Sequence, residues 1–290
     1  MTKNEKQYTQ QQKMPLRLLD PFIFFYYAEG MEEKTAISFA NVAAGYDDVN
    51  EVLTDVSFNI RSGAFYFLSG PSGAGKTTLL RLIYQLHRPM RGQIKLFGVS
   101  TGALTRNKIA ELRHKMAIVF QEYSLISHFS VFDNIALPLR VRGMDEDKIT
   151  KLVSKVLDWV GLSKYADANP KSLSGGQQQR VSVARAIIVQ PSILLADEPT
   201  GNLDDENASR LMELFIQMNK MFGTTIVLAT HSKKLMETYK FPVIQIDNHH
   251  VSFSESKQEA EPAKKIWKGP KPQNYFSELS KQFDDIGNIK

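Results

Sequence analysis

Short apolar runs alternate with segments of helical periodicity between about residues 35 and 253. The clearest candidates for buried strands are the runs at residues 65–68, 193–196 and 225–229, and each leads directly into a polar motif. Strands that alternate with helices predict a parallel α/β sheet. Open sheets of this kind bind their ligands beyond the carboxyl ends of the strands. We therefore expect the functional residues at that edge.

The pattern changes between about residues 122 and 172, where apolar residues recur at helical spacing. This segment predicts a helical subdomain inserted into an α/β domain that spans residues 35–253. Residues 1–34 combine a polar start with an aromatic patch, and residues 254–290 are rich in Lys, Glu, Pro and Gln. Both flanks are predicted to be flexible extensions. Met31 is a second candidate for the first residue of the protein.

Composition narrows the class of protein. The 290 residues, 42% of them hydrophobic, suffice for one large domain with a sizeable core. Cysteine is absent, which excludes a disulfide framework and thiolate metal sites. The apolar run at residues 22–28 is shorter than the roughly 20 residues of a membrane span. The net charge of +5 is scattered along the chain, so we expect no nucleic-acid partner.

A phosphate-binding motif follows the strand at residues 65–68. The sequence matches G-x-x-x-x-G-K-[ST] at every position. The motif and the threonine after it comprise Gly70, Pro71, Ser72, Gly73, Ala74, Gly75, Lys76, Thr77 and Thr78. In such a loop, backbone N–H groups surround the phosphates, Lys76 reaches the β- and γ-phosphates, and the Thr77 hydroxyl binds Mg²⁺. The motif predicts nucleotide binding, but kinases, GTPases and transport ATPases share it.

Two carboxylates end the apolar run at residues 193–196. Asp197 and Glu198 occupy a position where ionised groups need partners. Asp197 suits the Mg²⁺ site, whereas Glu198 projects differently and could polarise an attacking water. The alternative, a solvated acidic pair, is disfavoured by the phosphate-binding motif upstream.

A second anion-binding turn lies at Ser174, Gly175, Gly176 and Gln177, at the start of an expected helix over residues 177–189. The turn resembles the signature motif of ABC ATPases. The resemblance implies a head-to-tail homodimer with ATP held between the Lys76 loop of one subunit and the Ser174 turn of the other. The alternative for the turn alone is a capped structural helix.

Further matches to ABC ATPases follow in the order typical of the family. The resemblance implies that Tyr46 stacks on adenine and that Gln121 joins the core to the helical subdomain and touches Mg²⁺ or water. It also implies that Asp204 communicates across the dimer and that His231 faces the γ-phosphate. Ser232 departs from the family, which commonly has Asp after the histidine. The implied fold is a P-loop NTPase (RecA-like) parallel-sheet core with an antiparallel β edge and the inserted helical subdomain.

Within the family, residues 131–140 and 194–204 are similar to the FtsE-like branch, which acts in bacterial cell division. This implies an FtsX-like integral-membrane partner, docked in a groove near residues 122–129, and a peripheral location on the cytoplasmic face of the plasma membrane. Regulation of peptidoglycan hydrolysis is the implied output, and other cell-division proteins are further candidate partners. LolD-like lipoprotein-release and MacB-like export ATPases share residues 194–204 and remain the alternative.

Two other classes fit the motifs less well. A DNA-repair or structural-maintenance ATPase head would place a long coiled coil between the phosphate loop and the signature. Here about a hundred residues intervene, without sustained heptads. An adaptor that binds nucleotide without hydrolysing it would be expected to lack Glu198, which is present.

Overall fold

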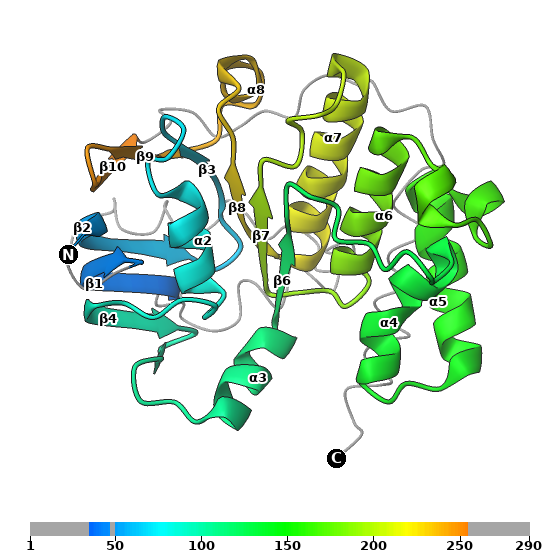
Figure 1. Ribbon diagram of the computed structural model, residues 1–290, viewed down its shortest axis with the longest axis horizontal. Helices are drawn as coiled ribbons and strands as arrows, with labels where there is room; N and C mark the ends of the chain where they lie inside the picture. The colour runs from blue at the N-terminus through cyan, green and yellow to red at the C-terminus, as the bar shows by residue number, and fades with distance from the viewer. Residues whose placement is uncertain (1–34, 47–49, 255–290) are drawn as a thin grey trace, which may run out of the picture. The chain divides into compact units, whose positions relative to one another are not determined.

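The computed structural model describes residues 35–46 and 50–254 (Figure 1). The predictions for the N-terminal extension, and for the tail beyond residue 254, lie outside the described residues. Among the described residues, no helix combines the length and the apolarity that crossing a membrane requires.

The main sheet has six strands in the order β10-β9-β3-β8-β7-β6. Its strands are β3 (Phe65–Ser69), β6 (Met116–Val119), β7 (Ile193–Asp197), β8 (Thr225–Ala229), β9 (Val243–Asp247) and β10 (His250–Ser254). All neighbours pair in parallel except β9 and β10, which are antiparallel. The three predicted buried strands are β3, β7 and β8, so the parallel α/β core is confirmed.

The expected antiparallel edge is a second sheet of four strands, in the order β2-β1-β4-β5. It contains β1 (Thr35–Gly45), β2 (Glu51–Arg61), β4 (Arg91–Leu96) and β5 (Val99–Ser100). Along β2, buried Val56, Phe58 and Ile60 alternate with exposed polar residues. This alternation is typical of an antiparallel strand with one solvated face.

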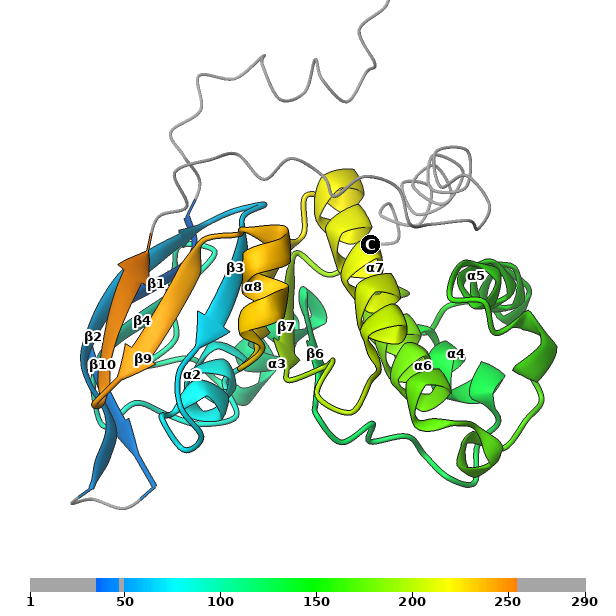
Figure 2. The ribbon, with the colours of Figure 1, turned by 90° about the horizontal axis from the view of Figure 1, so that it is seen from above.

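The main sheet separates two hydrophobic clusters. The helices are α2 (Lys76–Ile83), α3 (Arg106–His114), α4 (Val131–Val141), α5 (Glu146–Trp159), α6 (Gly175–Ile187), α7 (Asp205–Phe222) and α8 (Lys233–Tyr239). Leu194 and Ala196 of β7 belong to the cluster that contains the apolar residues of α4 to α7. Ile193 and Leu195 belong to the cluster that contains α2 and the antiparallel sheet. Figure 2 shows α2 and α6 on different sides of β7.

The helical subdomain contains α4 and α5, followed by short 3₁₀ turns at Ser163–Tyr165 and Pro170–Ser172. The predicted helical character of residues 122–172 lies in α4, α5 and these turns, whereas residues 122–129 form a loop before α4. The buried Asn134 holds this loop, because its amide accepts from the Ile126 N–H and donates to the Ile126 and Ser130 carbonyls. The side chain thereby satisfies backbone groups that a helix would otherwise pair.

Candidate functional site

The carboxyl ends of β3, β7 and β8 bring three of the predicted motifs to one edge of the sheet. Because β8 pairs with both β3 and β7, the phosphate loop, the Asp197–Glu198 pair and His231 follow neighbouring strands. The Glu198 N–H also donates to the Ala229 carbonyl. Residues about 160 positions apart in the sequence therefore share one site.

Two glycines shape the loop between β3 and α2. Gly73 has φ +78° and Gly75 has φ +104°, a region of backbone conformation that favours glycine. A Cβ on Gly75 would also lie only 3.0 Å from side-chain atoms of Val52 and Leu53. The loop ends at the N-terminus of α2, where free N–H groups and the helix dipole favour an anion.

The Lys76 side chain is buried inside this loop. Its Nζ atom donates to the Gly70 and Pro71 carbonyls at 2.9 and 3.0 Å and lies 3.7 Å from Glu198 Oε1. The loop thus holds a cation among backbone groups at the start of a helix. That arrangement suits a polyphosphate.

Thr77 and Asp197 are joined by a hydrogen bond. The Thr77 hydroxyl donates to Asp197 Oδ2 at 2.8 Å. Asp197 is only 8% exposed, and burial raises the pKa of its carboxyl group. A hydroxyl and a carboxylate are hard oxygen donors that fit Mg²⁺, which usually combines one or two protein ligands with phosphate oxygens and water. Gln121, the third expected ligand, is exposed just beyond β6, the strand next to β7.

Glu198 and His231 face each other across the carboxyl ends of β7 and β8. His231 Nδ1 lies 3.0 Å from Glu198 Oε2, and the histidine side chain is 66% exposed. Glu198 has φ +47°, a strained conformation for a residue with a Cβ. Strain of this kind is commonly retained at functional sites, where the surrounding structure holds a side chain in position.

Tyr46 lies against α2. Its hydroxyl is 3.0 Å from Thr78 Oγ1 and accepts from Arg81 Nη1 at 3.4 Å, while the residue as a whole is 60% exposed. These contacts place an accessible aromatic ring beside the helix that begins with the phosphate loop. Stacking on adenine remains a prediction for this residue.

The Ser174 turn forms a capping box at the start of α6. Ser174 Oγ accepts from the Gln177 N–H, and Gln177 Oε1 accepts from the Ser174 N–H. The turn therefore has the structural role that the alternative interpretation assigned to it. Because α2 and α6 pack into clusters on opposite faces of the sheet, the turn does not share a face with the Lys76 loop.

Asp204 and Ser232 are also helix caps. Asp204 accepts from the Asn207 N–H and side-chain amide at the start of α7, and these bonds keep the pKa of its carboxyl group below the ordinary value. Ser232 Oγ accepts from the Leu235 N–H at the start of α8. Serine thus supplies the cap that an aspartate would supply at that position, which accounts for the departure from the family pattern.

Comparison with known proteins decides the family. The model of the ABC transporter family matches residues 53–201. The chain is 39% identical to the cell division ATP-binding protein FtsE of Streptococcus pneumoniae (strain D39) over 223 residues, 77% of this chain and 96% of that protein. The corresponding protein of Escherichia coli K12 is 39% identical over 215 residues, 74% of this chain and 96% of that protein. This chain belongs to the ABC transporter family.

The fold comparison agrees with this membership. A dimeric ATP-binding cassette in a post-hydrolysis state, bound to ADP and Pi, matches with a TM-score of 0.70 and 30% identity. The match covers 77% of this chain and all of the cassette. As a member of the ABC transporter family, the chain is an ATPase subunit that binds and hydrolyses ATP. The predicted family, fold class and enzyme class are confirmed.

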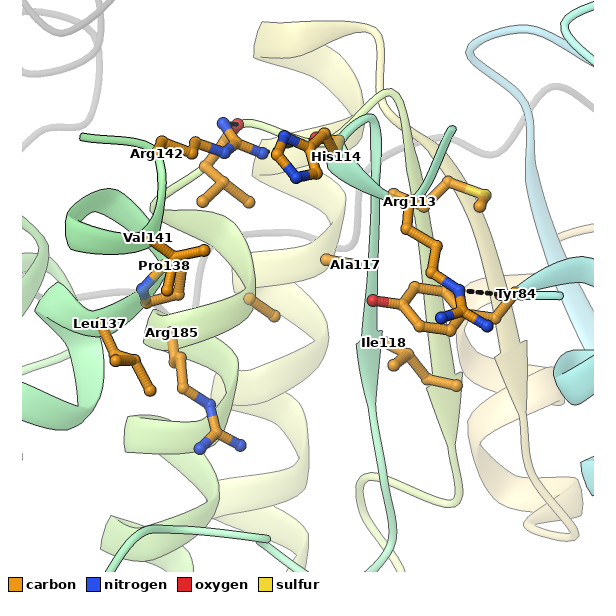
Figure 3. A pocket seen from close by; sticks show the side chains of 13 residues that line it. Tyr84, Arg113, His114, Ala117, Ile118, Leu137, Pro138, Val141, Arg142 and Arg185 are labelled. Atoms are coloured by element: carbon orange, nitrogen blue, oxygen red, sulfur yellow. Dashed lines mark hydrogen bonds between the residues drawn. The ribbon is translucent and has the colours of Figure 1, made fainter. Parts of the chain in front are cut away.

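The partner groove expected near residues 122–129 stays a prediction. A pocket between the core and the helical subdomain (Figure 3) has no lining residue from that segment. The segment borders the pocket instead, because Arg185 donates to the Tyr123 and Ser124 carbonyls. The lining residues come from separate elements and carry no common sequence motif, so pattern alone offered no signal for them.

Proposed function

We propose that this ABC ATPase works as a head-to-tail homodimer that drives an FtsX-like membrane protein in bacterial cell division and thereby regulates peptidoglycan hydrolysis. The observation that carries the proposal is 39% identity to FtsE proteins across 96% of their length. The chain acts from the cytoplasmic face of the plasma membrane as a peripheral subunit.

The phosphate loop binds the triphosphate. Lys76 exchanges the neutral Gly70 and Pro71 carbonyls for phosphate oxygens, a stronger, charge-assisted contact. Thr77, Asp197 and Gln121 hold Mg²⁺ directly or through water, and the ion, when bound, neutralises negative charge on the phosphates. Tyr46 stacks on the adenine ring.

Glu198 accepts the proton of the attacking water. His231 orients this carboxylate through the 3.0 Å contact and faces the γ-phosphate. The opposite placement of the two anion-binding turns supports a dimer in which the Ser174 turn of one subunit completes the site of the other. Asp204 lies at the start of α7 in the same interface.

The catalytic proposal is tested with Glu198→Gln. The amide is a poor base, so turnover should fall about 10²–10⁴-fold while ATP binding persists. Trapped ATP should also hold the dimer together, as a light-scattering mass of two subunits that reverts when nucleotide is removed. Glu111→Gln, an exposed substitution in α3, is the matched control. A monomeric Glu198→Gln protein with bound ATP would contradict the dimer, and full turnover would remove Glu198 as the base.

The cellular proposal is tested by depletion and co-purification. The tagged chain should co-purify with an integral-membrane protein, and depletion should cause division or wall-separation defects. Lipoprotein mislocalisation or drug sensitivity would instead assign the chain to the lipoprotein-release or export branch. If no membrane protein co-purifies, the proposed cellular function fails.

A further inference from the structure

A histidine that belongs to none of the predicted motifs follows the C-terminal end of α2. His87 lies between α2 and β4 and is half-buried. Its backbone N–H and that of Leu86 donate to the Arg81 carbonyl at 3.3 and 2.8 Å. These bonds fix the backbone that carries the imidazole to the end of α2.

The imidazole of His87 reaches the residue before Tyr46. Its Nε2 atom lies 2.7 Å from the carbonyl oxygen of Gly45, the last residue of β1. Because a carbonyl group only accepts, Nε2 carries the hydrogen of this bond. The bond joins positions 42 residues apart in the sequence. It fixes the backbone at the point where β1 leads into Tyr46.

The same imidazole lies against the Tyr46 ring. The two ring centroids are 5.2 Å apart and the ring planes make an angle of 34°, a separation typical of attractive aromatic pairs. At its other end, the tyrosine hydroxyl contacts Thr78 and Arg81 of α2. Tyr46 is thus held through its preceding carbonyl, its ring and its hydroxyl, although the residue is 60% exposed.

Such contacts matter for a ring that binds a ligand by stacking. An exposed aromatic side chain loses conformational entropy when a ligand fixes its orientation, and this loss weakens binding. A ring that is already held in the binding orientation avoids the loss. All the contacts of Tyr46 described above come from α2 and the segment after it, and α2 begins at the phosphate loop. One helix therefore sets where the ring lies relative to the phosphate site.

We propose that His87 is a positioning residue for the adenine base, whose hydrogen bond to Gly45 keeps Tyr46 in the orientation that stacks on the base. This inference rests on the proposed function, which assigns the stacking to Tyr46. His87 acts through Tyr46 and takes no part in the chemistry at the γ-phosphate. The apparent affinity for ATP falls in proportion to the fraction of molecules in which the ring has the binding orientation.

The full-length His87→Ala variant is compared with the wild type in KM and kcat for Mg-ATP and in its inhibition by magnesium tripolyphosphate, which has phosphates but no base. We expect KM to rise about fivefold while kcat and the inhibition constant of tripolyphosphate stay unchanged. His114→Ala, an exposed change at the end of α3, is the matched control. An unchanged KM, or an equal loss of tripolyphosphate binding, would overturn the proposal, because the latter indicates a general loosening of the site.

His87→Gln tests the hydrogen bond separately from the ring. The glutamine amide nitrogen is as many bonds from Cα as Nε2 of histidine, so it can donate to the Gly45 carbonyl in the same way. We expect its KM for ATP to lie closer to that of the wild type than to that of His87→Ala. A glutamine variant as weak as the alanine variant would exclude this bond as the means of positioning.

Tyr46→Ala separates this inference from the proposed function. Loss of the stacking ring should raise KM for ATP about tenfold. Adding His87→Ala to Tyr46→Ala should then cause no further change, because His87 acts through the tyrosine. If Tyr46→Ala has the KM of the wild type, the proposed stacking itself fails. If Tyr46→Ala raises KM but His87→Ala does not, or if the two losses add in the double variant, only this inference fails.

Discussion

At the scale of single residues, Asp197 combines burial with a negative charge. Its carboxyl group accepts from Thr77, lies beside Glu198 and is almost inaccessible to water. Burial raises its pKa, so the folded protein holds the proton more tightly than the unfolded chain does. The charged form therefore opposes folding at any pH above the folded-state pKa, and this effect disappears below the ordinary value of 3.8.

Asp197→Asn should therefore stabilise the nucleotide-free protein and abolish Mg²⁺-dependent hydrolysis. The neutral amide has the same shape and no charge to desolvate. At pH 7 we expect the melting temperature to rise by about 2–4 °C, the shift that each kcal/mol gives in a domain of this size. Differential scanning calorimetry and an ATPase assay measure the two effects. A lower melting temperature would show that the hydrogen bond from Thr77 outweighs the desolvation of the charge.

Lys76→Ala should weaken ATP binding about 10–100-fold, the loss expected on removing a charged hydrogen-bond donor. It also leaves the Gly70 and Pro71 carbonyls without their donor. Titration with a fluorescent ATP analogue gives the dissociation constant. Lys108→Ala, an exposed change in α3, controls for the loss of one positive charge. Unchanged affinity in Lys76→Ala would exclude the loop as the phosphate site.

At the scale of secondary-structure elements, several of the predicted site residues lie at the N-termini of helices. Ser174, Asp204 and Ser232 cap α6, α7 and α8, and Gly75 precedes α2. A cap satisfies N–H groups within the chain, whereas the glycine loop before α2 leaves its N–H groups for a ligand. The Ser174 side chain can therefore stabilise α6 in the monomer and bind ATP in the proposed dimer.

Variants of Ser174 separate these two roles. Ser174→Ala removes the cap and should lower the free energy of unfolding by about 1 kcal/mol. Ser174→Asn keeps a capping side chain and should leave stability nearly unchanged. Ser174→Arg should prevent ATP-dependent dimerisation of the Glu198→Gln protein, because its bulk and charge enter the interface. Urea unfolding and light scattering provide the measurements. Normal dimerisation of the Arg variant would place the interface elsewhere.

At the scale of the whole molecule, the main sheet divides the core in two. The cluster with α2 supports the phosphate loop, and the cluster with α4 to α7 supports the helix that begins at the Ser174 turn. Both clusters are built from residues within the described ranges. In the proposed dimer the two faces therefore contribute different halves of an ATP site, the Lys76 loop on one face and the Ser174 turn on the other.

A shortened chain that begins at Met31 should fold and hydrolyse ATP like the full chain. The composition changes before this residue, and the motifs and both described clusters follow it. Circular dichroism melting and ATPase rates compare the two proteins. Aggregation of the shorter chain would show that the aromatic patch at residues 22–27 packs on the domain.

The sequence by itself determined the features that depend on neighbouring residues. The strand–loop–helix of the phosphate motif, the buried strand before Asp197 and the capped start of α6 are each encoded within about ten consecutive residues. Backbone preferences and hydrophobic periodicity act over that distance, so the sequence pattern was sufficient to predict these three features. Together with the order of the motifs, these segments identified the family.

Only the tertiary structure decided which distant segments meet. The insertion of β8 between β3 and β7 sets His231 against Glu198, and the Asn134 side chain holds Ile126 and Ser130 of the loop before α4. Arg113 of α3, Arg142 just after α4 and Arg185 of α6 line one pocket, although they are far apart in the sequence. Strand order and helix packing set these contacts, because they depend on how whole elements bury their apolar faces against one another.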